Sequence, residues 1–145
     1  MAASQHPESR AGQRNPMVTP EDLQRIIVEG DTELLVDRAT RIGAGLAGQL
    51  TSTQLRNVFG TVRLIEAMWT PKKDDVQQTK AARQLLLLKP KLAYQAKRQR
   101  GRGVEELERV LVPVIELVGK DYARFQRFVE FFEAIVAYHT AAGAE

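Results

Sequence analysis

Apolar side chains return at every third or fourth position along most of this chain, which is the spacing of one face of an α-helix. The clearest stripe keeps this period for four turns, from Leu55 through Val58, Val62 and Ile65 to Trp69. No run of alternating apolar and polar residues stands between turn signals, so no strand is expected. The pattern predicts an all-α protein, a compact helical bundle of five to seven helical pieces with no sheet.

Capping residues and helix breakers set the expected bounds of these helices. Thr51 and Gln54 form a capping-box pair, and Thr19, Asp31 and Asp121 are good N-cap residues that stand before other apolar-periodic segments. The expected helices cover about residues 20–29, 32–49, 52–69, 75–88, 91–100, 104–118 and 122–141.

Two prolines fall inside segments that are otherwise helical in pattern. Because proline has no N–H and restricts the residue before it, Pro90 is expected to make 91–100 a separate or sharply kinked helix. Pro113 is expected to bend or divide its own helix for the same reason.

The chain divides into two parts of different character. Residues 1–16 are polar and contain almost no large apolar side chain, so they cannot offset the entropy of their own ordering. We expect a disordered N-terminal arm over 1–16 and a single helical-bundle domain over 17–145. The last helix carries the most aromatic stripe, so it is expected to be central, with its phenylalanines in the core and not on a base-stacking surface.

The composition removes most enzyme chemistry. The chain has 145 residues, no cysteine and two histidines, His6 and His139. Disulfides, thiolate metal sites and cysteine nucleophiles are therefore absent, and no serine or carboxylate stands in a catalytic spacing with a histidine. We expect no enzyme activity, no catalytic residue, no metal site, no cofactor and no small-molecule substrate.

No apolar run approaches the ~20 residues that a membrane-spanning helix needs. The N-terminal segment lacks the apolar stretch of a secretory signal. The expected location is cytoplasmic, with no membrane partner.

Two features resemble functional motifs and are better explained by packing. Residues 43–48 (GAGLAG) match the G-x-G-x-x-G spacing of dinucleotide sites, but no strand precedes them. Small residues there favour close approach of another helix backbone. His139 lacks an acidic residue three or four positions away, so it is interpreted as a residue at the core margin or at a helix C-terminus.

Charge is distributed unevenly along the chain. Residues 1–102 carry 17 basic and 10 acidic side chains, whereas residues 103–145 carry 4 basic and 8 acidic ones. The densest basic stretch, residues 89–102, contains no acidic residue. Arg56, Gly60 and Arg63 follow one another at four and three residues on the expected third helix, which places them on one face.

These two groups together predict a groove for a nucleic-acid backbone, bound through its phosphates without base-specific contacts. Tyr94, inside the basic stretch, either stacks on a base or packs inward. The alternatives are a helical protein–protein adaptor whose basic face meets an acidic partner, and a DNA-binding regulator. For the second alternative no recognition helix is present.

Three segments, residues 51–66 (TSTQLRNVFGTVRLIE), 85–98 (LLLLKPKLAYQAKR) and 125–143 (FQRFVEFFEAIVAYHTAAG), resemble the small subunit of the type III-A CRISPR effector (Csm) complex. This resemblance implies a small, non-catalytic helical protein of antiviral defence, present in more than one copy. It also implies that the protein lies along guide RNA and target RNA, beside the backbone and large subunits of a ribonucleoprotein complex and further copies of itself.

The resemblance assigns RNA-facing roles to Arg56, Lys89, Lys91 and Arg98. Charge and spacing add Arg63, Lys97, Arg100 and Arg102 to this set. Members of the family often have small residues after the Ala-Tyr pair, whereas this chain continues with QAKRQR over residues 95–100.

Overall fold

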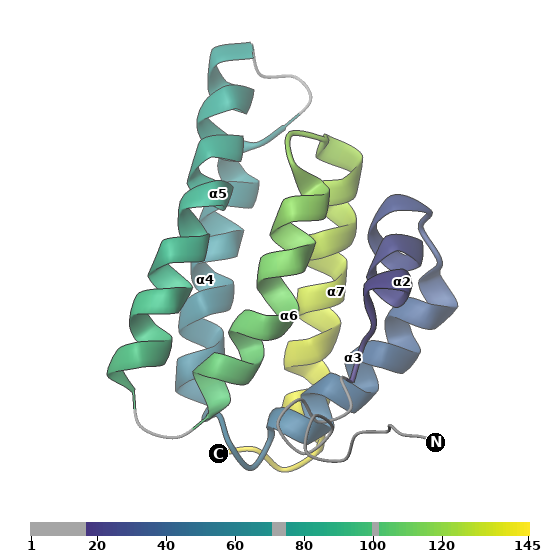
Figure 1. The fold of residues 1–145 in the computed structure, drawn as a ribbon, viewed down its shortest axis with the longest axis vertical. Coiled ribbons are helices and arrows are strands. Elements are labelled where there is room, and N and C mark those ends of the chain that lie inside the picture. Colours follow the sequence, from purple (N-terminus) through teal and green to yellow (C-terminus); the bar gives the residue numbers. More distant parts are fainter. Residues whose placement is uncertain (1–16, 71–74, 100–101) are drawn as a thin grey trace, which may run out of the picture.

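The computed structural model describes residues 17–70, 75–99 and 102–145 (Figure 1). These residues form helices and contain no strand, which confirms the predicted all-α bundle. The expected arm over 1–16 lies outside the described residues. The elements are α2 (Pro20–Leu23), the π-helical segment η1 (Gln24–Val28), α3 (Thr32–Leu46), α4 (Ser52–Met68), α5 (Asp75–Arg98), α6 (Gly103–Val118) and α7 (Tyr122–Ala141).

The helix starts follow the capping chemistry of the sequence. The Thr51 hydroxyl accepts a hydrogen bond from the Gln54 N–H at 3.1 Å, and the Gln54 side chain accepts one from the Thr51 N–H at 2.9 Å. Asp31 and Asp121 accept in the same way from the N–H groups three residues on. These bonds satisfy donors that the first turn of a helix leaves without partners.

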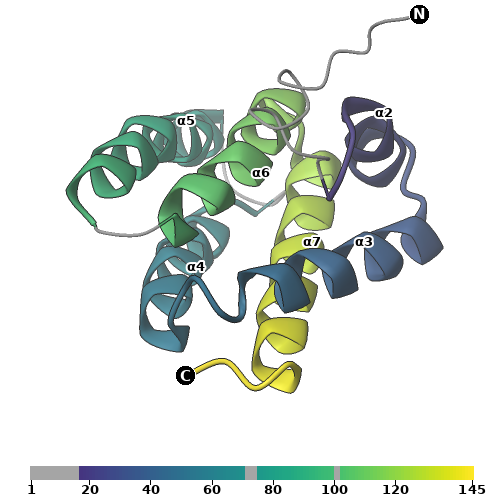
Figure 2. The same ribbon diagram turned by 60° about the horizontal axis from the view of Figure 1, so that its bottom comes forward.

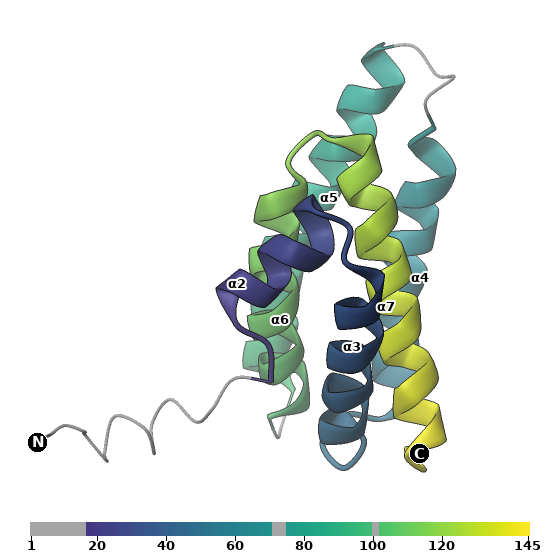
Figure 3. The ribbon, with the colours of Figure 1, turned by 90° about the vertical axis from the view of Figure 1, so that its right-hand side faces the viewer.

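Helix α7 is the centre of the bundle and contacts α3, α4 and α6 (Figures 1 and 3). The Trp69 ring stacks on Phe125 of α7 at 4.6 Å between ring centres, and Phe59 of α4 packs on Phe132 at 5.0 Å. The phenylalanines of α7 are fully buried, as predicted: Phe125, Phe128, Phe131 and Phe132.

The glycine-rich part of α3 crosses directly over α7 (Figure 2). A Cβ atom placed on Gly43 would lie 2.7 Å from the backbone nitrogen of His139 and 2.8 Å from the carbonyl oxygen of Ile135. The absence of a side chain at Gly43 therefore lets two helix backbones touch, as predicted. Gly103 likewise leaves no room for a Cβ beside the carbonyl oxygen of Gln49. Gly48, in the same segment as Gly43, has nothing within 4 Å of the position that a Cβ would take.

The two internal prolines do not divide their helices, and the expectation of a separate helix after Pro90 is wrong. Helix α5 runs without interruption from Asp75 to Arg98, and α6 contains Pro113. Proline at position 90 removes the donor for the carbonyl of Leu86. Both residues are exposed, so water is able to satisfy that carbonyl and the helix continues.

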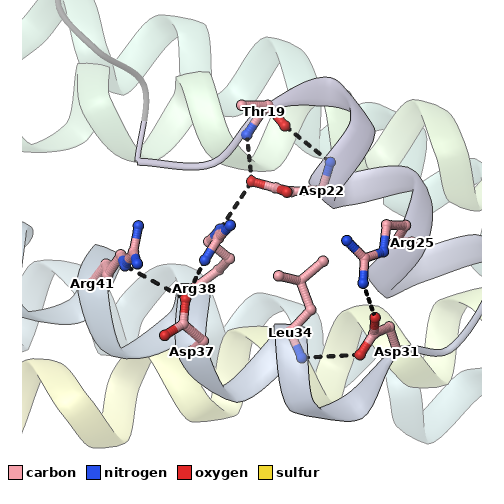
Figure 4. A network of polar contacts seen from close by, with 8 residues as sticks. All are labelled: Thr19, Asp22, Arg25, Asp31, Leu34, Asp37, Arg38 and Arg41. Carbon is pink, nitrogen blue, oxygen red and sulfur yellow. Dashed lines mark hydrogen bonds and ion pairs between the residues drawn. The ribbon is translucent and has the colours of Figure 1, made fainter.

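Charged side chains join α2 to α3 in a network that Figure 4 shows. Arg38 Nε of α3 donates to the Asp22 carboxylate of α2 at 2.9 Å. The hydrogen bond from Arg38 lowers the pKa of Asp22, and the same contact raises the pKa of Arg38. The hydrogen bond from the Leu34 N–H, followed by that from Arg25, lowers the pKa of Asp31.

Candidate nucleic-acid interface

Helices α4 and α5 are antiparallel neighbours, and this arrangement positions most of the predicted RNA-facing residues (Figure 1). The Gln54 side chain near the start of α4 donates to the side chain of Gln99, just after the end of α5. The two helices that carry the predicted basic groups therefore lie side by side at this end of the bundle.

A line of exposed side chains runs along the outer face of α5, and we name it the α5 stripe. Its members follow one another at seven, four, three and four residues, which keeps them on one face of a helix. They are Lys80, Leu87, Lys91, Tyr94 and Arg98, all exposed.

Tyr94 points outward: it is 61% exposed and does not pack into the core. Arg98 Nη1 donates to the Tyr94 hydroxyl at 3.0 Å, and Arg98 Cζ lies 5.7 Å from the ring centre. Arg98 is therefore in contact with both the hydroxyl and the ring of Tyr94. With 61% of the residue exposed, much of the side chain remains accessible, as a stacking interaction with a nucleobase requires.

Two predicted cations of this region lie off the α5 stripe. Lys89 turns toward α6, where its Nζ forms an ion pair with Glu116 at 2.8 Å. Lys97 precedes Arg98 by one residue, which places it about 100° around the helix from the stripe. It is exposed and has no ion-pair partner among the described residues.

The two arginines of α4 lie on the flank away from α5. Arg63 Nε forms an ion pair with Glu66 at 3.0 Å, and its Cζ lies 5.7 Å from the centre of the Phe59 ring, which packs toward α7. Arg56 follows Gln54 by two residues, about 200° around the helix from the bond to α5. It is exposed and has no partner among the described residues.

The α4 arginines and the α5 stripe are thus separate groups, with the exposed outer ridge of α4 between them. Asn57, Gly60 and Leu64 form that ridge. Gly60 makes a low point in it, because nothing lies within 4 Å of the position that a Cβ would take. No part of this chain that the structure describes explains the glycine.

The last predicted pair lies in the connection between α5 and α6. Arg102 is exposed just before α6, and its carbonyl accepts the Glu106 N–H at 2.8 Å. Arg100 lies outside the described residues.

Lys80 is a member of the stripe that sequence reasoning missed. It precedes Lys91 by eleven residues, which is three helical turns, so the signal was present in the spacing. The expected helix break at Pro90 placed Lys80 and Lys91 on different helices, so their spacing was not recognised as one helix face.

Neither a metal site nor a membrane span emerges from the described residues. They contain no group of three or more histidine, aspartate or glutamate side chains placed to hold a metal ion. None of their helices is long and apolar enough to cross a membrane.

Fold and surface define a small all-helical protein with one strongly basic helix face. The Csm2 Type III-A family model matches residues 29–145, from the end of the first helical segment through α7. The chain belongs to this family and is a small subunit of the type III-A Csm effector complex, as the three sequence segments predicted. The family is a structural one and is generally non-catalytic. No curated protein and no solved structure matches the chain significantly.

Proposed function

We propose that this subunit binds guide RNA and target RNA within the effector complex through phosphate contacts that do not depend on base sequence, without catalysis of its own. The observation that carries the proposal is the α5 stripe. Lys91 and Arg98 stand on either side of an exposed tyrosine ring, and neither cation has a carboxylate partner among the described residues. Guide pairing would supply sequence specificity, and the protein would supply cations along the backbone.

Arg56 extends this surface across α4. Because Gly60 carries no side chain, a phosphate backbone that leaves the α5 stripe meets little obstruction at the ridge of α4 before it reaches Arg56. On such a path the RNA backbone contacts first the α5 stripe and then Arg56, so the two basic groups do not need to line a single groove. It also gives the exposed glycine a role that packing within the chain does not.

The remaining predicted cations take secondary positions in this proposal. Lys89 and Arg63 would exchange Glu116 and Glu66 for phosphates, which costs little because exposed ion pairs contribute about 0–1 kcal/mol. Lys97, Arg100 and Arg102 would add charge near the end of α5. Each copy alone would bind weakly, and adjacent copies held by the backbone and large subunits would gain through effective concentration.

The test is a binding titration of the purified chain with two RNAs of unrelated sequence, each single-stranded and paired to its complement, at several salt concentrations. We expect similar affinities for both sequences and an affinity that falls steeply with salt, because bound cations release counterions. An affinity that does not change with salt contradicts the proposal. Salt-sensitive binding to an acidic protein but not to RNA would favour the adaptor function.

A further inference from the structure

An apolar groove lies between α5 and α6, toward the end of the bundle where α5 extends past the turn from α6 to α7 (Figure 1). Helix α5 has 24 residues and its antiparallel neighbour α6 has 16, so the first turns of α5 have no α6 residue beside them. The groove has a volume of about 470 Å³. The Lys89–Glu116 ion pair lies beside it.

The floor of this groove is hydrophobic. Ala82, Leu85 and Ile115 are buried at its base, and Leu86 lines it while 57% exposed. Single exposed leucines are ordinary on a protein surface, but a concave apolar site of several hundred Å³ has the size and shape that accept an inserted side chain. Val76, 66% exposed, continues the apolar surface along α5.

The rim carries positive charge that no ion pair within the described residues neutralises. Arg83 of α5 and Lys120 after α6 both line the groove, and neither has a partner among the described residues. Glu116 also lines it, but its carboxylate already holds Lys89. The groove therefore combines an apolar floor with two cations that form no ion pair in the part of the chain that the structure describes.

We propose that this groove binds a segment of a partner protein that inserts a large aliphatic or aromatic side chain and places carboxylates against Arg83 and Lys120. An RNA backbone would satisfy the cations but leave the apolar floor exposed to water. A protein segment with an apolar anchor and flanking acidic residues matches both features. Membership in a complex with other subunits supplies such partners, and the inference does not depend on RNA binding.

The groove and the α5 stripe lie mostly on different flanks of the same helix, and they meet at Arg83, which is three residues after Lys80 and four before Leu87. Thr79, Ala82 and Leu86 follow one another at three and four residues on the flank toward α6. Lys91 and Arg98 lie on the outer face. One helix is thus able to contact a protein and an RNA at the same time.

A photo-crosslinking experiment on the complete effector complex tests the proposal. Benzoylphenylalanine replaces Leu86 in the groove and, as the matched control, Leu64 on α4, which is 71% exposed. We expect the probe at 86, and not the probe at 64, to crosslink to a segment of a different protein subunit with acidic residues beside an apolar one. Crosslinks to RNA or to a second copy of this chain, or none in the assembled complex, would overturn the proposal.

A charge-reversal pair supplies an independent measurement. The double variant Arg83→Glu/Lys120→Glu is expected to lower incorporation into the complex about tenfold, because it places like charges against the partner. The control Arg83→Lys/Lys120→Arg keeps both charges and should assemble normally. Circular dichroism and Tm of the free variants establish that both fold. Normal incorporation of the folded charge-reversed variant would refute the charge complementarity.

Discussion

His139 of α7 donates a hydrogen bond from its imidazole Nε2 to the carbonyl oxygen of Leu50, 2.6 Å away. A carbonyl only accepts, so Nε2 carries the proton. The imidazole is 1% exposed, which places it deeper than the core margin that the sequence suggested. The bond fastens the turn between α3 and α4 to the last helix across 89 residues of sequence.

Replacing His139 by alanine should therefore destabilise the fold. The variant leaves a buried carbonyl without its donor and a void where the ring was, which together cost about 2–4 kcal/mol in the free energy of unfolding. Urea unfolding followed by circular dichroism measures the loss. His139→Gln retains a side-chain N–H and should lose less; equal stability of all three proteins would show that the bond contributes nothing.

Gly43→Ala should weaken the crossing of α3 and α7. The added methyl group would meet three backbone atoms of α7 that cannot move independently of their helix, and overpacking of this kind costs about 1–3 kcal/mol. Gly60→Ala is the matched control, because its Cβ meets nothing within 4 Å. There, alanine should raise the free energy of unfolding by about 1 kcal/mol through helix propensity. Similar effects at both sites would contradict the packing argument.

Stability should fall in acid because two carboxylates are held charged by native contacts. The pKa values of Asp22 and Asp31 lie below their ordinary 3.8 in the folded protein. The contribution of these two carboxylates to the free energy of unfolding is therefore fully present above pH 3.8. It is lost as the pH falls from 3.8 through their lowered pKa values in the folded protein. Urea midpoints measured between pH 6 and pH 2 should decline in this lower range. In the Asp22→Asn variant the urea midpoint should decline less steeply over this pH range than in the wild-type protein. An equally steep decline in the variant would show that Asp22 does not contribute to the acid sensitivity.

Lys91→Ala/Arg98→Ala should weaken RNA binding equally for unrelated sequences. Each cation that neutralises a phosphate contributes about 0.7 to the slope of log affinity against log salt for a single strand, so the double variant should lose about 1.4. Filter binding at several salt concentrations provides both values. Lys120→Ala, which removes an unpartnered lysine away from the stripe, is the control. A loss confined to one RNA sequence would contradict phosphate recognition.

Tyr94→Ala should reduce affinity for single-stranded RNA by the stacking energy of one base, about 1–3 kcal/mol. Tyr94→Phe keeps the ring and loses the hydroxyl that Arg98 contacts, so it should retain most of the affinity. Fluorescence anisotropy with a labelled oligonucleotide measures the difference. Equal losses in the two variants would indicate that the hydroxyl, and not the ring face, matters.

Sequence periodicity and capping predicted the helices and the core because those features depend on residues close in sequence. The capping box at Thr51 and the aromatic stripe of α7 are local patterns, and the structure shows both as expected. The family was predictable for a related reason, since its segments coincide with α4, α5 and α7.

The arrangement of the basic residues was not predictable in the same way. Whether Arg63 meets Glu66 and Lys89 meets Glu116 depends on side-chain rotamers and on how α5 packs against α6. The flank on which Arg56 lies depends on which side of α4 faces α7. The effect of Pro90 depends on whether the carbonyl that it leaves without a donor faces water or protein.

The uninterrupted course of α5 through Pro90 has a mechanical consequence for whatever binds its outer face. At 1.5 Å per residue, the Cα atoms of Lys80 and Arg98 lie about 27 Å apart along one continuous helix. A break at the proline would have placed these two residues on separate helices. Because the helix continues, a bound molecule meets the charges at both ends at intervals that helix geometry sets.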